Sequence, residues 1–337
     1  MSPVGTALAG QREARARFTP GAPGAPVIAL RNVTKHYRSG GGIDDVTLEV
    51  HPGEVFGFLG PNGAGKTTTI RLLVDLIRPD RGELSIFGLD PRRDGIAVRR
   101  RIGYLPGDLV LYEKMTAGEL LLHFARLRGG PGSPEIEALA EQFALDLRTP
   151  IAALSKGNKQ KVGFLQAVMG TPELLVLDEP TTGLDPLVQH QAHELLRAVA
   201  GSGRTVFLSS HFLSEVQQVA DRVAMIKAGR VVAVESVAGL RSRSVHLVDV
   251  RTVERLEPEA FSRLPGVGAL QATDFSAHFE FAGPLDPLVR ELSRLALADL
   301  SIREPDLEDV FLSYYDGHDD TAAPSPALGR AGSDGER

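Results

Sequence analysis

The 337 residues allow two modest domains or one domain with appendages, at about 100 to 200 residues per domain. Hydrophobic residues make up 42% and charged residues 24%, as in globular proteins rather than disordered or fibrous ones. The formal net charge of −6 argues against a global basic field for nucleic acid or anionic lipid and leaves a local patch open. The absence of cysteine excludes disulfides, thiolate zinc sites and cysteine nucleophiles, so a reducing cytoplasm is the default expectation.

The two ends of the sequence differ from the rest in composition. Residues 1–26 are rich in Gly, Ala, Pro and Arg and lack the apolar stretch of a secretory signal, so we expect a flexible tail. Residues 316–337 offer almost nothing to bury and predict a disordered tail. No window approaches the roughly 18 consecutive apolar residues of a membrane-spanning helix, so the chain is not expected to cross a bilayer alone.

The pattern of apolar residues from position 27 to position 77 predicts strands followed by a helix. Residues 27–33 and 45–50 alternate apolar and polar side chains, and residues 55–59 form the short apolar run of a buried central strand. Residues 66–77 then carry apolar side chains at helical spacing. The order predicts a strand, a glycine-rich turn and a helix in succession.

The middle of the sequence predicts a helical insert within an α/β order. Residues 117–127, 134–143 and 158–169 carry helix-period apolar side chains with no strand-like segment between them. Short apolar runs return after the insert and predict further strands of the buried sheet, the last two as a hairpin: residues 174–177, 205–208, 223–226 and 231–234.

The turn after residue 59 matches the phosphate-binding pattern G-x-x-x-x-G-K-[ST]. Backbone N–H groups of such a loop converge on phosphate oxygens, and the helix N-terminus adds positive potential. Lys66 would reach the terminal phosphates, and Thr67 can bind Mg²⁺ through its hydroxyl. A glycine-rich turn with an incidental lysine is the alternative, which the strand-to-helix context disfavours. The matching residues are Gly60, Pro61, Asn62, Gly63, Ala64, Gly65, Lys66 and Thr67.

Two carboxylates, Asp178 and Glu179, follow the strand predicted over residues 174–177. Asp178 would hold Mg²⁺ from outside the ion's first layer of ligands, and Glu179 could polarise a water for in-line attack on the γ-phosphate. Alone, this pair would more commonly be a solvated acidic turn before Pro180. The phosphate-binding pattern upstream favours the catalytic interpretation.

Taken in order, these motifs resemble those of ATP-binding cassette (ABC) proteins over roughly residues 27–234. The overall character is similar to the ATPase subunits of bacterial drug exporters of the daunorubicin-resistance type, which work with a separately encoded permease. The segments that carry the resemblance are the phosphate loop, Leu154-Ser155-Lys156-Gly157-Asn158, LLVLDEP at 174–180, Gly183-Leu184-Asp185 and Ser209-Ser210-His211.

The resemblance implies a role for further residues. Tyr37 would stack on adenine, the alternative being an ordinary half-buried strand aromatic, and Thr68 would join the phosphate loop in binding the nucleotide. His211 would contact the γ-phosphate and orient Glu179 and the water. Asp185 would connect the two nucleotide sites of a dimer. The signature residues would close over ATP bound by the opposite subunit, although the serine could also be a plain helix N-cap: Ser155, Lys156, Gly157 and Asn158.

The sequence departs from the pattern that the resemblance implies at three positions. Gly107 stands where the family usually has a glutamine that touches Mg²⁺ and relays nucleotide state to the permease, and water or Asp108 is the expected substitute. Lys156 replaces a glycine and Asn158 a glutamine, while Ser155 and Gly157 are kept. We therefore expect intact turnover with altered coupling.

The periodicity changes after residue 244 and predicts a second domain of order β-α-β-β-α-β, a possibly ferredoxin-like α+β fold. No cluster of titratable groups suggests chemistry there, so a packing domain is the simpler interpretation. The predicted segments are strands at 246–250, 269–273, 278–281 and 300–303, helices at 258–264 and 286–297, and a final helix at 307–315.

Together these features predict an α/β phosphate-loop ATPase of the ABC type at 27–235, with a helical subdomain at about 107–172 and an accessory domain at 236–315. The resemblance implies a subunit that binds and hydrolyses Mg-ATP as a homodimer, or alternatively a heterodimer. It would power an integral membrane permease from the cytoplasmic face of the membrane, with no nucleic acid as partner. The alternatives are a soluble ABC-type ATPase acting on ribosomes or DNA, and a non-catalytic nucleotide sensor.

Overall fold

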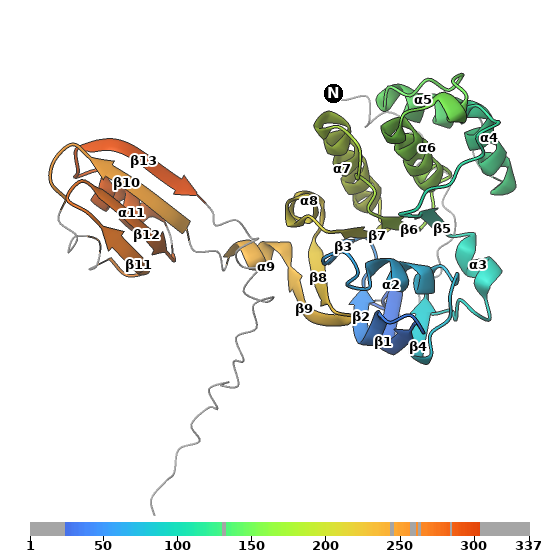
Figure 1. Ribbon diagram of the computed structural model, residues 1–337, viewed down its shortest axis with the longest axis horizontal. Helices are drawn as coiled ribbons and strands as arrows, with labels where there is room; N and C mark the ends of the chain where they lie inside the picture. Colours follow the sequence, from blue (N-terminus) through green and yellow to red (C-terminus); the bar gives the residue numbers. More distant parts are fainter. Residues whose placement is uncertain are drawn as a thin grey trace, which may run out of the picture.

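The computed structural model describes residues 24–129, 133–242, 246–256, 261, 264–283 and 285–303 (Figure 1). Three sheets organise these residues: one of six strands, one of three and one of four. The predicted α/β fold is confirmed, with an inserted group of helices. The tail segments expected at both ends, and the helix predicted at 307–315, lie outside the described residues or largely so.

The six-stranded sheet is parallel except for its last strand, which pairs antiparallel in the predicted hairpin. Its three central strands are buried at every residue, as expected for a sheet covered on both faces. In sheet order the strands are β5 (Ile102–Leu105), β6 (Leu174–Asp178), β7 (Thr205–Ser210), β3 (Val55–Leu59), β8 (Arg222–Lys227) and β9 (Arg230–Ser236).

Side chains that alternate along the central strands supply two separate cores. On one face, Phe56 and Phe58 of β3 flank Phe207 of β7, with ring centroids 5.9 and 5.5 Å from it. This face packs with α2 (Lys66–Leu73) and the small sheet, while the opposite face packs against helices of the insert and those after β6. The parallel strand ends are therefore held rigidly at one edge.

The three-stranded sheet covers α2 and has the order β2-β1-β4, all antiparallel. Its strands are β1 (Ile28–His36), β2 (Gly42–Val50) and β4 (Arg81–Ile86). Three elements were not predicted from the sequence. They are β4, an exposed and mostly polar edge strand, the four-residue β5, and the five-residue α3 (Gly95–Arg99).

The helices confirm the predicted insert, which holds α4 (Ala117–Leu127), α5 (Ser133–Gln142) and α6 (Lys156–Val168). A capping box between Thr116 and Glu119 starts α4. In the ranges that the structure describes, no helix is both long and apolar enough to span a membrane. The remaining elements of this part are η1 (Ile151–Ala153), α7 (Pro186–Gly201), α8 (Leu213–Val219) and α9 (Val237–Ser242).

The four-stranded C-terminal sheet has the order β11-β12-β10-β13 with every neighbouring pair antiparallel. This second-third-first-fourth order is the one expected for a ferredoxin-like arrangement. The helix predicted at 258–264 lies mostly outside the described residues. The elements are β10 (His246–Thr252), β11 (Val267–Ala272), β12 (Ser276–Phe281), α11 (Leu285–Leu292) and β13 (Leu297–Arg303).

Two predicted helices end earlier in the structure. Helix α2 stops at Leu73 instead of residue 77, because Asp75 adopts a left-handed backbone with φ of 58°. Helix α11 stops at Leu292 instead of residue 297, because residues from Leu297 onward pair with β10 as a strand. Helical spacing of leucines continued across both ends and could not mark them.

Candidate functional site

The loop between β3 and α2 places its glycines where side chains would collide or strain the backbone. A Cβ on Gly60 would lie 2.4 Å from the Ile226 carbonyl oxygen. Gly63 and Gly65 have φ of 80° and 114°, and Gly65 is the N-cap of α2. The loop therefore turns tightly from the strand into the helix, with backbone amides available at the helix N-terminus.

Lys66, the first residue of α2, lies folded over this loop. Its Nζ donates hydrogen bonds to the carbonyl oxygens of Gly60 at 2.7 Å and Pro61 at 3.2 Å. The same ammonium lies 3.5 Å from Oε1 of Glu179, and the Lys66 side chain is only 5% exposed. The Lys66 ammonium thus links the loop to the carboxylate that follows β6.

Asp178, at the end of β6, is the most enclosed acidic group of the site at 1% exposure. Its Oδ2 accepts a hydrogen bond from Thr67 Oγ1 at 2.8 Å, and its Oδ1 accepts one from Ser209 Oγ at 2.6 Å. The Ser209 hydroxyl also accepts from the backbone N–H of Glu179 at 3.0 Å. Ser209 was missed as an Asp178 partner, although it stands in the Ser209-Ser210-His211 segment.

Glu179 is held in a sparsely populated left-handed conformation with φ of 49°. Its Oε2 accepts a hydrogen bond from Thr182 Oγ1 at 3.2 Å. Oε1 lies 3.2 Å from Nδ1 of His211. This ring nitrogen is buried and forms no hydrogen bond within the described residues. One carboxylate oxygen of Glu179 thus faces Lys66 and His211, and the other is restrained by Thr182.

The signature residues begin α6, and a residue further along the helix reaches the carboxylate segment. Ser155 is the N-cap, its Oγ accepting from Asn158 N at 3.2 Å, so the plain capping role is present in the structure. Gln160 donates from Nε2 to the carbonyl oxygens of Glu179 and Pro180 at 3.3 and 3.1 Å. Gln160 was missed by the sequence analysis, because an amide inside a helix carries no motif of its own.

Gly157, Lys156 and Asp185 lie nearby. A Cβ on Gly157 would be 3.0 Å from the carbonyl oxygen of Gly183, which places the start of α6 against the turn before α7. Lys156 is exposed. Asp185 caps α7 by accepting from Val188 N at 3.1 Å. In the part of the chain that the structure describes, no hydrogen bond joins the four signature residues to Lys66.

Tyr37 lies in the turn between β1 and β2, where its N–H donates to the Gly41 carbonyl at 3.2 Å. Its ring is half-buried, which fits either the adenine role or the structural alternative. The predicted phosphate-loop residues, including Thr68 as the third residue of α2, follow one another from β3 into this helix.

Gly107 approaches Asp178 so closely that a side chain would collide with it. A Cβ at this position would lie 2.9 Å from Oδ2 and 3.2 Å from Cγ of Asp178. The neighbouring Asp108 is 93% exposed, and its Oδ2 lies 3.7 Å from a guanidinium nitrogen of Arg71.

Burial, followed by the charge of Asp178, raises the pKa of Tyr104, which lies on the adjacent strand β5.

The side-chain oxygens at the end of β6 and the start of α2 are suited to a hard cation that binds together with a second ligand. The Thr67 hydroxyl is an oxygen ligand of the kind Mg²⁺ prefers, and the Asp178 carboxylate that accepts its hydrogen bond could hold such an ion from outside its first layer of ligands. Among the described residues, no three His, Cys, Asp or Glu side chains cluster as a self-sufficient metal site. A cation here would need further oxygens from a phosphate-bearing ligand or from water.

Comparisons with known proteins agree with this geometry. Residues 43–182 match the family model described as ABC transporter. The chain is 35% identical to the daunorubicin/doxorubicin resistance ATP-binding protein DrrA of Streptomyces peucetius, over 85% of this chain and 91% of that protein. It is 33% identical to mouse ATP-binding cassette sub-family A member 7 over 93% of this chain, which spans only 16% of that protein.

A solved structure of an ATP-binding subunit of an ABC transporter superposes with a TM-score of 0.59 and 33% identity. It covers 64% of this chain and 92% of that chain. The order of motifs, the strand-loop-helix geometry around Lys66 and these similarities lead to one assignment. The chain belongs to the ATP-binding proteins of the ABC transporter family, and its relatives include a drug-resistance ATP-binding protein.

Proposed function

We propose that this chain hydrolyses Mg-ATP as a dimer to power a separately encoded integral membrane permease that exports a drug, an antibiotic or a lipid-like compound. The convergence of Lys66, Asp178, Glu179 and His211 at one edge of the sheet carries the proposal. The similarity to a daunorubicin/doxorubicin resistance protein supports export. The permease would hold the chain at the cytoplasmic face of the membrane.

ATP would bind with its phosphates in the loop before α2 and its adenine against Tyr37. Amides of the loop and the helix N-terminus suit an anion, because both direct positive potential at it. Lys66 would exchange its contacts with the carbonyls of Gly60 and Pro61 for the terminal phosphates. The proposed phosphate-binding residues are Gly60, Pro61, Asn62, Gly63, Ala64, Gly65, Lys66, Thr67 and Thr68.

Thr67 and Asp178 would hold Mg²⁺ beside the bound phosphates, because both present oxygen atoms at one point. When bound, the ion would offset negative charge on the phosphate oxygens. Ser209 keeps Asp178 oriented through its 2.6 Å hydrogen bond, so the carboxylate is positioned before any ligand arrives. Preorganisation of this kind lowers the cost of binding.

Glu179 would act as the general base in hydrolysis. Its carboxylate would accept a proton from the water that attacks the γ-phosphorus, and the β–γ bridging oxygen would leave with ADP. Nδ1 of His211, 3.2 Å from Oε1, would orient the carboxylate and the water. Thr182 restrains the other carboxylate oxygen, which limits the directions in which Glu179 can accept the proton.

A second copy would complete the site. The exposed Ser155 and Lys156, with Gly157 and Asn158, would face ATP bound to the partner, and Asp185 would connect the two sites. Each chain supplies one phosphate loop and one signature, so a homodimer is the simplest arrangement and a heterodimer is the alternative. We propose residues 27–235 as the ATPase domain and 236–315 as an accessory domain.

Replacing the proposed base gives the decisive test. In Glu179→Gln we expect nucleotide binding to persist and steady-state hydrolysis to fall by at least about 10²-fold, the usual range for loss of a general base. Glu137→Gln on the exposed surface of α5 is the matched control and should hydrolyse ATP like the wild type. Equal hydrolysis in Glu179→Gln and wild type would refute the assigned role.

Two alternatives predict other outcomes. A non-catalytic nucleotide sensor, which the glycine at position 107 favours, would bind ATP without measurable hydrolysis even as the wild type. A ribosome- or DNA-associated ATPase would co-purify with nucleic acid instead of an integral membrane protein. The net charge of −6 weighs against that second alternative.

A further inference from the structure

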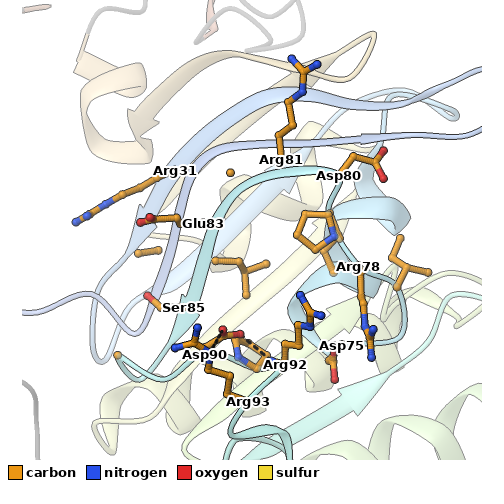
Figure 2. Close-up of a pocket in the computed structure, with 18 residues that line it drawn as sticks. Arg31, Asp75, Arg78, Asp80, Arg81, Glu83, Ser85, Asp90, Arg92 and Arg93 are labelled. Atoms are coloured by element: carbon orange, nitrogen blue, oxygen red, sulfur yellow. Dashed lines mark hydrogen bonds and ion pairs between the residues drawn. The ribbon is translucent and has the colours of Figure 1, made fainter.

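A hollow of about 600 Å³ lies at the β4 edge of the three-stranded sheet, beside the end of α2, and half of the residues that line it are charged (Figure 2). This volume is within the usual range of ligand-binding pockets. We call it the arginine hollow, after the five arginines that line it: Arg31, Arg78, Arg81, Arg92 and Arg93. None of these residues belongs to the nucleotide site proposed above.

Four different parts of the chain bring the arginines together. Arg31 lies on β1 and Arg81 begins β4, whereas Arg78 follows α2. Arg92 and Arg93 lie between β4 and α3. Figure 2 shows Arg78, Arg92 and Arg93 at one end of the hollow with Asp75 and Asp90, and Arg81 at the other end. The clustering is therefore a product of the fold.

The acidic side chains of the arginine hollow already have cationic neighbours. Asp80 is 2.8 Å from Lys35 Nζ, whose hydrogen bond is the main reason that the pKa of Asp80 is lowered. Asp75 and Asp90 lie 3.2 and 3.6 Å from Arg99 and Arg93, respectively. The remaining carboxylate, Glu83, stands opposite Arg31 in the β1–β4 ladder.

This pairing leaves three guanidinium groups uncompensated. Arg78, Arg81 and Arg92 are exposed, and within the described ranges their side chains make no ion pair. Guanidinium groups bind phosphate oxygens in bidentate geometry, which makes them suited to phosphate-bearing ligands. The excess of positive charge on a concave surface contrasts with the chain's net charge of −6.

Large apolar side chains are exposed beside these arginines. Ile96, on α3, is 69% exposed and lines an adjoining hollow of about 310 Å³ that shares Asp75, Arg92 and Arg93 with the first. Leu76, next to Asp75 in the chain, is 61% exposed. Basic side chains around exposed apolar ones are typical of surfaces that bind the interface of an anionic membrane.

We propose that the arginine hollow binds the phosphate groups of anionic phospholipids at the membrane surface, with Ile96 contacting the acyl boundary. The proposal rests on the membrane location in the proposed function and adds a direct lipid contact to docking on the permease. The net charge of −6 left a local basic patch open, and the arginine hollow is such a patch. Lipid is favoured over soluble phosphate compounds because apolar and cationic groups are exposed together.

Vesicle binding by the full chain, without permease or nucleotide, tests the proposal. We expect sedimentation with vesicles of phosphatidylcholine plus phosphatidylglycerol, little with phosphatidylcholine alone, and weaker binding as ionic strength rises. The triple variant Arg78→Gln/Arg81→Gln/Arg92→Gln should lose roughly 100-fold in affinity, from about fivefold per arginine. Ile96→Ser alone should bind vesicles more weakly than the wild type, with the larger relative loss at high salt, where the arginines are screened.

A matched control separates location from total charge. Arg126→Gln/Arg148→Gln/Arg197→Gln removes the same charge from exposed arginines elsewhere and should bind nearly as the wild type. The arginines within residues 1–23 are present in all these proteins, so their contribution cancels. Equal losses in the two triple variants would overturn the arginine hollow as the binding site.

Two further outcomes would also reject the lipid assignment. One is the absence of vesicle binding by the wild type, and the other is equal competition by soluble polyphosphate with no dependence on Ile96. Neither affects the proposed hydrolysis, which Glu179→Gln tests in a separate assay. Conversely, loss of hydrolysis in wild-type preparations would leave the vesicle result interpretable, because vesicle binding requires no turnover.

Discussion

Two aspartates on different sheets each have two side-chain partners at similar distances, but in opposite surroundings. Asp178 ends a strand of the parallel sheet and accepts hydrogen bonds from Thr67 and Ser209 at 2.8 and 2.6 Å. Asp249, on the C-terminal sheet, has His278 Nδ1 at 2.6 Å and a guanidinium nitrogen of Arg303 at 2.8 Å. Asp178 is 1% exposed, whereas the Asp249 side chain is 41% exposed.

The difference shows that burial, rather than the number of partners, distinguishes the two sites. The hydrogen bond with His278, followed by that from Arg303, lowers the pKa of Asp249, but water screens such exposed pairs and their net contribution is small. Around Asp178, hydroxyl groups from two other elements enclose the carboxylate where water is largely excluded. Strand ends of a covered parallel sheet provide this setting, and an open sheet face does not.

Replacing each of the two aspartates with asparagine should give the largest difference in ATP hydrolysis between the two regions. Asp178→Asn removes the charge proposed to hold Mg²⁺ and should lower kcat for ATP hydrolysis by roughly 10³-fold, equivalent to several kcal/mol of transition-state stabilisation. Asp249→Asn should leave hydrolysis within about twofold, because its partners are exposed. Steady-state phosphate release measures both, and a comparable loss in Asp249→Asn would contradict the comparison.

Core phenylalanines test whether the two regions are independent. Phe207→Ala removes a fully buried ring between Phe56 and Phe58 and should cost about 3–5 kcal/mol in the free energy of unfolding. Phe279→Ala, whose ring packs 5.0 Å from Phe261, should cost a similar amount in the C-terminal sheet. Calorimetry should show each substitution lowering a different transition, whereas equal shifts in one transition would argue against the proposed boundary at 235.

The sequence predicted the buried strands and the phosphate loop because both leave local patterns. Continuous apolar runs predicted β3 and β6, and glycine spacing predicted the loop before Lys66. It did not predict β4, whose exposed polar residues show no apolar alternation, or α3, which is too short for a helical period. Local patterns therefore predicted the fully buried central strands better than the exposed β4 and the short α3.

Contacts between distant segments were beyond the sequence patterns. Ser209 reaches Asp178 only because β6 and β7 pair in register, and Gln160 reaches Glu179 only through the packing of α6. From the sequence alone, Gly107 stands in place of a polar ligand. The structure adds that this glycine allows close approach to Asp178, which single-residue patterns do not reveal.

Gly107→Ala should disturb the buried aspartate without removing it. The added Cβ would meet Oδ2 of Asp178 at 2.9 Å, so the carboxylate or the loop must shift. We expect roughly tenfold lower ATPase activity, because small displacements at a reacting site reduce rate, and a higher Mg²⁺ requirement. Gly201→Ala, where nothing lies within 4 Å of the new Cβ, is the matched control. Unchanged Mg²⁺ dependence in Gly107→Ala would contradict the proposed close packing.

The smallest expected effect concerns His193, a buried imidazole on α7 in the ATPase region. Its Nδ1 lies 3.1 Å from Oε1 of Gln218, and burial is the main cause that lowers its pKa from the ordinary value of 6.5. The hydrogen bond with Gln218 and the charge of Glu215 oppose this shift, while Arg197 and His190 add to it.

Because the pKa of His193 is lower in the folded chain, the unfolded chain binds more protons as pH falls below about 6.5. The His193 contribution to stability is therefore present above that pH and lost on acidification. Melting temperatures measured from neutral to mildly acidic pH should fall more steeply for wild type than for His193→Gln, whose amide does not titrate. The transition assigned to the C-terminal sheet, followed in the same scans, should be unaffected by the substitution. Parallel pH profiles of wild type and variant would show that burial of His193 does not govern this response.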